Sequence, residues 1–128
     1  MMQSPIYPPP VILLADDDES LRRLVHATIP PDEFEVLEAS DGNEALRLAR
    51  ARHPGVVLLD IAMPARNGFE VCAELKGDPA TADIKVLMLT GLHAEVDRKR
   101  ASQVGADGYL TKPFSPRELL DTILNLLR

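Results

Sequence analysis

The chain has 128 residues, of which 45% are hydrophobic and 27% charged, and its net charge is −6. These values are typical of one soluble globular domain. The acidic balance disfavours nucleic-acid binding, a lone cysteine excludes an intramolecular disulfide, and no apolar run is long enough to span a membrane. We expect a cytoplasmic protein without a secretory signal.

Residues 1–10 are expected to form an extended, proline-rich leader, because proline lacks the backbone donor that a helix needs. A single domain is expected over residues 11–128. It begins with Val11–Ala15, a continuous apolar run typical of a strand buried on both faces of a parallel sheet. Asp18 or Ser20 then provides the N-cap of an amphipathic helix, which a pair of prolines ends.

Phe34–Ala39 is predicted to be the second strand. Asp41, with Glu44 three positions later, indicates a capping box at the start of the second helix. Val56–Leu59 is a wholly apolar third strand that stops at Asp60. A carboxylate is therefore expected at the carboxyl end of a buried strand.

A third helix is predicted around Phe69–Leu75, a fourth strand over Ile84–Leu89 and a weakly amphipathic helix over Ala94–Val104. Gly108–Thr111 is predicted to be a short fifth strand. Ser115, followed by a proline and then a glutamate at the third helical position, starts the last helix. Five alternating strand–helix units predict an α/β domain with a mostly parallel sheet and helices on both faces.

Polar side chains follow four of the predicted strands: Asp16 and Asp17 the first, Asp60 the third, Thr90 the fourth and Lys112 the fifth. Ligands of open parallel sheets bind at the carboxyl ends of the strands, so these side chains are expected to converge. Three clustered carboxylates repel one another unless a cation lies among them, and an all-oxygen site suits Mg²⁺. The pattern predicts a magnesium site.

With a metal in place, one carboxylate could attack phosphorus and form an aspartyl phosphate. Lys112 would neutralise the phosphoryl charge, and Thr90 would donate a hydrogen bond to a phosphoryl oxygen. Each feature alone has a plainer interpretation; the acids of Asp16–Glu19, for example, could simply favour a helix start. Their joint placement at strand ends favours the phosphoryl-transfer hypothesis.

Five segments, in order along the chain, carry a resemblance to a known family: Ile12–Asp18, Leu58–Pro64, Asn67–Gly68, Leu87–Gly91 and Gly105–Phe114. Over Val11–Arg128 the chain resembles the receiver domains of two-component response regulators. Its length and layout are similar to those of the single-domain chemotaxis regulators. The resemblance implies a flavodoxin-like (βα)5 three-layer sandwich, with a five-stranded parallel sheet of order 2-1-3-4-5, and a phosphorylation-controlled signalling switch.

The resemblance also implies roles for single residues. Asp60 would be the phosphoacceptor and a metal ligand, Asp17 would bind Mg²⁺ directly, and Asp16 would bind it mainly through water. The backbone carbonyl of Ala62 would be a further ligand. Ala62 and Leu92 occupy the two variable positions that tune phosphoryl lifetime in this family. Neither can orient an attacking water, so we expect slow self-dephosphorylation.

Thr90 and Tyr109 are implied to be the switch pair. Thr90 would move toward the phosphoryl group and Tyr109 would rotate inward behind it, although Tyr109 could instead be a static, half-buried aromatic. Lys112 would contact the phosphate, and its peptide bond to Pro113 is expected to be cis.

The implied phosphoryl donor is a sensor histidine kinase or a histidine phosphotransfer protein. The fourth helix, fifth strand and fifth helix would form an output face for a downstream effector protein or for an output domain missing from this chain. No direct contact with nucleic acid or membrane is expected, and a phosphorylation-dependent homodimer is possible. The domain would act on itself by phosphoryl transfer and autodephosphorylation, so it is not expected to be a conventional enzyme.

Two other interpretations remain. The chain could be a pseudo-receiver that binds partners without phosphorylation, or a flavin carrier or metabolic enzyme of similar architecture. The second is disfavoured because acids, and not a glycine-rich phosphate loop, follow the first strand. Whether the receiver stands alone or is a piece of a longer regulator is left open.

Overall fold

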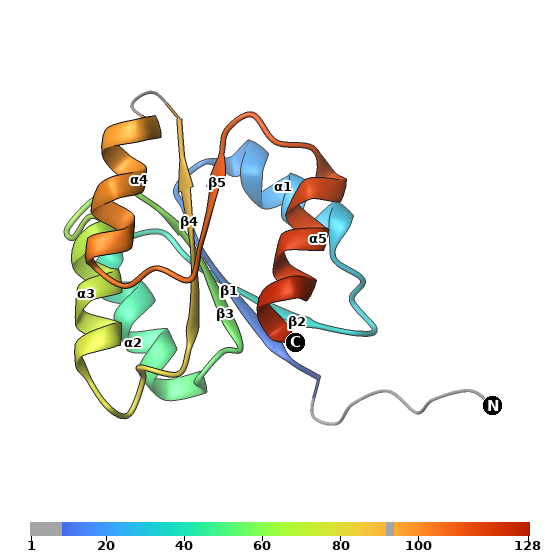
Figure 1. Ribbon diagram of the computed structural model, residues 1–128. Helices are drawn as coiled ribbons and strands as arrows, with labels where there is room; N and C mark the ends of the chain where they lie inside the picture. Colours follow the sequence, from blue (N-terminus) through green and yellow to red (C-terminus); the bar gives the residue numbers. More distant parts are fainter. Residues whose placement is uncertain (1–8, 92–93) are drawn as a thin grey trace.

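The computed structural model describes residues 9–91 and 94–128; most of the predicted leader and Leu92 lie outside the described residues. Within these ranges five strands alternate with five helices (Figure 1). The strands are β1 Val11–Ala15, β2 Glu35–Ala39, β3 Val56–Asp60, β4 Lys85–Thr90 and β5 Gly108–Thr111. The helices are α1 Glu19–Thr28, α2 Gly42–Arg52, α3 Gly68–Gly77, α4 Ala94–Gln103 and α5 Pro116–Leu127. No helix in the described ranges is long and apolar enough to cross a membrane.

The strands form one parallel sheet in the order β2-β1-β3-β4-β5, which confirms the predicted architecture. The strand β1 pairs with β2 on one side, where Ile12 lies opposite Val36, and with β3 on the other, where Leu13 lies opposite Val57. The strand order reverses between β1 and β3, so the helices that follow these two strands cover opposite faces (Figure 1). This is the place where open α/β sheets bind ligands.

Two apolar cores flank the sheet, because successive strand side chains point to opposite faces. Leu13 and Val57 pack with residues of α2, α3 and α4. Ile12, Leu14 and Leu58 pack with residues of α1 and α5. All five side chains are fully buried, and burial of each stabilises the fold by about 1.5–3 kcal/mol. The need for apolar residues on both faces explains why β1 and β3 have no alternating pattern.

Local hydrogen bonds set the ends of the elements. Asp18, and not Ser20, is the N-cap of α1, since its carboxylate accepts the Ser20 N–H at 2.9 Å. The capping box predicted for Asp41 and Glu44 forms only in part. Asp41 accepts the N–H of Glu44 at 2.8 Å, but the Glu44 carboxylate accepts the N–H of Ser40 at 2.8 Å.

Two predicted strands begin one residue late. The N–H of Phe34 donates to the carbonyl of Pro30 at 3.2 Å, and that of Ile84 donates to the carbonyl of Thr81 at 3.0 Å. Both are turn hydrogen bonds and so remove these donors from the sheet. The capping box predicted at Ser115 is complete.

Cys72 is fully buried in the core on the α2–α3–α4 face. Burial raises the pKa of its thiol to about 11, and the thiolate is the form that reacts with electrophiles. We therefore expect iodoacetamide to leave the native protein unlabelled and to label it fully in urea, as read by intact mass. Rapid labelling of the native protein would contradict this burial.

Candidate functional site

Three carboxylates meet at the carboxyl ends of β1 and β3. Oxygen atoms of Asp16, Asp17 and Asp60 all lie within 4.8 Å of one another. Asp16 and Asp60 are buried and Asp17 is exposed. The predicted convergence is thus present, at the point where the strand order reverses.

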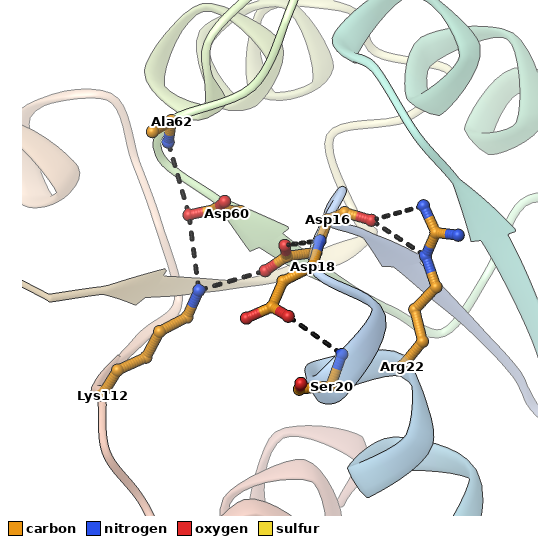
Figure 2. Close-up of polar contacts among 7 residues, drawn as sticks. All are labelled: Asp16, Asp18, Ser20, Arg22, Asp60, Ala62 and Lys112. Atoms are coloured by element: carbon orange, nitrogen blue, oxygen red, sulfur yellow. Dashed lines mark hydrogen bonds and ion pairs between the residues drawn. The ribbon is translucent and has the colours of Figure 1, made fainter.

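Asp16 is fully buried, and both its carboxylate and its backbone carbonyl have polar partners. One carboxylate oxygen accepts the N–H of Asp18 at 2.8 Å, and the other lies 3.2 Å from the ammonium of Lys112 (Figure 2). The guanidinium of Arg22 donates two hydrogen bonds, of 3.2 and 3.1 Å, to the backbone carbonyl of Asp16. These contacts fix the turn between β1 and α1, which carries both Asp16 and Asp17.

Asp60 lies between Ala62 and Lys112 (Figure 2). Its Oδ1 accepts the N–H of Ala62 at 3.3 Å and lies 3.8 Å from the ammonium of Lys112. Burial and, after it, the charge of Asp16 raise the pKa of the Asp60 carboxyl, Lys112 lowers it, and the net result is a pKa of about 6. Repulsion by Asp16 is one part of the cost of ionising Asp60, and a bound cation would relieve that part.

The loop after β3 is held close to α3. The N–H of Gly68 donates to the carbonyl of Ile61 at 2.9 Å, and Asn67 and Glu70 form a capping box that starts the helix. A Cβ atom at Gly68 would lie 2.5 Å from the carbonyl oxygen of Asp60. The absence of a side chain at Gly68 therefore lets α3 begin directly behind Asp60.

Lys112 comes from the far side of the site, after β5, and its peptide bond to Pro113 is cis, as the resemblance implied. An open cavity of about 460 Å³ lies beside it. The residues that line the cavity are Asp60, Ile61, Ala62, Thr90, Gly91, Asp97 and Lys112. Three of the side chains predicted for phosphoryl transfer, those of Asp60, Thr90 and Lys112, therefore share one cavity.

The two predicted switch residues both contact α4. Thr90 is buried, and its hydroxyl donates to Oδ2 of Asp97 at 2.8 Å. Tyr109 is half-buried, and the guanidinium of Arg98 lies 5.2 Å from the centre of its ring. The side chain of Thr90 is therefore engaged by α4, a contact that the sequence did not predict.

The structure brings together every predicted site residue that lies in the described ranges, apart from Tyr109, which lies on β5 and does not line the cavity. Sequence reasoning missed Asp97 and Arg22. An acidic residue in the first turn of a helix, such as Asp97, is also expected from the helix dipole alone. Arg22 binds a backbone carbonyl, which leaves no signature in the sequence.

Comparison with known proteins agrees with this geometry. Residues 12–124 match the family model of the response regulator receiver domain. The chain is 43% identical over 117 residues to the probable transcriptional regulator ycf27 of Cyanophora paradoxa, and the match covers 91% of this chain and 48% of that protein. The chain thus spans about half the length of the curated relatives it matches.

Two solved structures are similar over nearly the whole chain. The chemotaxis response regulator CheY4 of Vibrio cholerae has a TM-score of 0.85 and 34% identity, covering 93% of this chain and 99% of that chain. The phosphorylated cyanobacterial phytochrome response regulator RcpA has a TM-score of 0.77 and 29% identity, covering 92% and 91%. Fold, strand-end residues and family match agree, and the chain belongs to the receiver domains of two-component response regulators.

Proposed function

We propose that this receiver accepts a phosphoryl group on Asp60, with Mg²⁺ held by the neighbouring carboxylates. The observation that carries the proposal is the cluster of Asp16, Asp17 and Asp60, whose oxygens lie within 4.8 Å of one another beside Lys112. The similarity to RcpA, whose structure is that of a phosphorylated protein, supports it.

The donor set fits Mg²⁺. The carboxylates of Asp16, Asp17 and Asp60 and the backbone carbonyl of Ala62 would hold the ion, and all are hard oxygen ligands. The raised pKa of Asp60 supports this fit, because it reflects first the burial of the carboxyl and then the cost of placing a second charge beside Asp16. When bound, Mg²⁺ would offset that charge and the charge of the incoming phosphoryl group.

In the proposed step, a carboxylate oxygen of Asp60 attacks the phosphorus of a phosphohistidine on a histidine kinase or phosphotransfer protein. The O–P bond forms as the P–N bond breaks, and the donor imidazole leaves with the electron pair and takes up a proton. The ammonium of Lys112 would move from Asp16 and Asp60 toward the phosphoryl oxygens, and Thr90 would donate to one of them.

Phosphorylation would then alter an output face made of α4, β5 and α5 and read by an effector protein or by an output domain. A transcriptional output is consistent with the name of the Cyanophora paradoxa relative. Under this proposal the receiver works in the cytoplasm, where the kinase domain that phosphorylates it would act. Its own chemistry would be limited to taking up and losing the phosphoryl group on itself. A homodimer through the output face would be one form of the switched state.

Intact-mass spectrometry after incubation with acetyl phosphate and Mg²⁺ tests the proposal. We expect one phosphoryl adduct on the wild type and its complete loss in Asp60→Asn and in the presence of EDTA. Asp32→Asn, which removes an exposed carboxylate in the turn between α1 and β2, should keep the adduct. If neither acetyl phosphate nor beryllofluoride modifies or binds the wild type, the phosphoacceptor role is wrong and the pseudo-receiver interpretation gains support.

A further inference from the structure

We propose that Asp97 is a positioning residue that holds the hydroxyl of Thr90 in the resting protein, and that this hydrogen bond must break before Thr90 can act on a phosphoryl group. The inference rests on the proposed phosphorylation of Asp60. It adds an internal restraint on that reaction, located on α4.

The geometry makes the two uses of Thr90 mutually exclusive. Thr90 is the last residue of β4 and is only 3% exposed, and its hydroxyl donates to Asp97 at 2.8 Å. A hydroxyl has one proton to donate, so it cannot donate to Asp97 and to a phosphoryl oxygen together. Because the acceptor is a carboxylate, the bond is of the stronger, charge-assisted kind.

The negative charge of Asp97 also disfavours the phosphorylated state. Asp97 lines the same cavity as Asp60 and Lys112, which is the space where a phosphoryl group would be held. A second carboxylate at that cavity, in addition to Asp60, opposes the arrival of an anion. Release of Thr90 and withdrawal of Asp97 would therefore favour the phosphorylated state together.

The next residue on the same helix contacts the other proposed switch residue. The guanidinium of Arg98 lies 5.2 Å from the ring centre of Tyr109, within the range of a cation–π contact. Consecutive residues of α4 thus touch both Thr90 and Tyr109. Loss of the Asp97 contact would loosen the tie between α4 and the site, which gives a physical route from the site to the output face.

The restraint has a measurable effect on ligand affinity. If only the fraction of molecules with a free Thr90 hydroxyl can bind a phosphoryl analogue well, the apparent Kd is the intrinsic value divided by that fraction. Removing the acceptor raises the fraction. A hydrogen bond to a charged group is strong enough for the apparent affinity to rise about tenfold.

The test is a calorimetric titration of the whole chain with beryllofluoride in the presence of Mg²⁺. Asp97→Ala should bind about tenfold more tightly than the wild type. Asp97→Asn, which keeps a neutral acceptor, should show a smaller gain. Glu95→Gln removes an exposed charge from the same helix and should leave the affinity within about twofold of the wild type.

A Thr90→Val background separates the hydrogen bond from the charge. In the Thr90→Val background, the gain in beryllofluoride affinity caused by Asp97→Ala should shrink to the small change expected from loss of the carboxylate charge alone. The hydroxyl that Asp97→Ala would release is absent in this background. Equal affinity of Asp97→Ala and Glu95→Gln would overturn the inference, and so would a gain that survives undiminished in Thr90→Val. If the wild type itself binds no beryllofluoride, the proposed function fails first, and the inference with it.

Discussion

In metal-free buffer near neutral pH, Asp60→Asn is expected to be more stable to unfolding than the wild type by about 2 kcal/mol. Asp60 is only 9% exposed, and its pKa rises from the ordinary value of 3.8 to about 6 through burial and the charge of Asp16. A raised pKa means that the ionised form is disfavoured in the folded state. An amide of the same shape has no such charge.

The pH dependence follows from the sign of this shift. Below the unfolded pKa of about 3.8 the carboxyl is protonated in both states, and Asp60 carries no penalty. As pH rises through 3.8 and on through 6, the unfolded state ionises first, so the wild type loses stability relative to the variant. The advantage of Asp60→Asn should therefore be small near pH 4, reach its full size near pH 7, and be about 3 kcal/mol at most.

Urea unfolding in EDTA at the two pH values measures this difference directly. The other carboxyl groups titrate in both proteins and largely cancel in the comparison. Asp32→Asn serves as the control for loss of an exposed charge and should change stability little at either pH. Added Mg²⁺ should narrow the gap, since it stabilises the folded wild type more than the variant. A gap independent of pH would show that the carboxylate charge is not its cause.

Regular patterns made most of the fold predictable. The strands β1 and β3 are apolar because both faces of the sheet are covered there, and each apolar run stops at an aspartate. The ends of the predicted strands placed Asp60, Thr90 and Lys112 at one edge of the sheet, so the candidate site could be assembled from strand ends alone. The N-cap of α1 stayed ambiguous because Asp18 and Ser20 are both good caps, and only the chain path selects Asp18.

The unpredicted features depend on distances between elements. Asp16 and Asp17 are adjacent acids, and the sequence does not say that Asp16 is buried against Lys112 while Asp17 faces solvent. Asp97 contacts Thr90 because of the position at which α4 packs along β4. Side-chain contacts of this kind are set by the packing of helices on the sheet and have no local sequence signal.

Gly68→Ala is expected to destabilise the protein by about 3 kcal/mol, the upper end of the usual cost of overpacking. The added Cβ would lie 2.5 Å from the carbonyl oxygen of Asp60 and 3.0 Å from the Cα of Ile61. Both are backbone atoms, so relief requires a shift of the β3–α3 loop and not of a side-chain tip. That shift would also displace Asp60 and Ala62, so weaker binding of beryllofluoride with Mg²⁺ is expected.

Gly77, at the other end of α3, provides the matched control. A Cβ at Gly77 meets no atom within 4 Å, so Gly77→Ala should be neutral or should stabilise the helix by about 0.5–1 kcal/mol. Urea unfolding measures the stability of both variants, and titration with beryllofluoride measures the affinity of each. Equal stability of the two variants would contradict the close approach of α3 to Asp60. A loss of stability in Gly68→Ala with unchanged beryllofluoride affinity would show that α3 supports the fold without positioning the site.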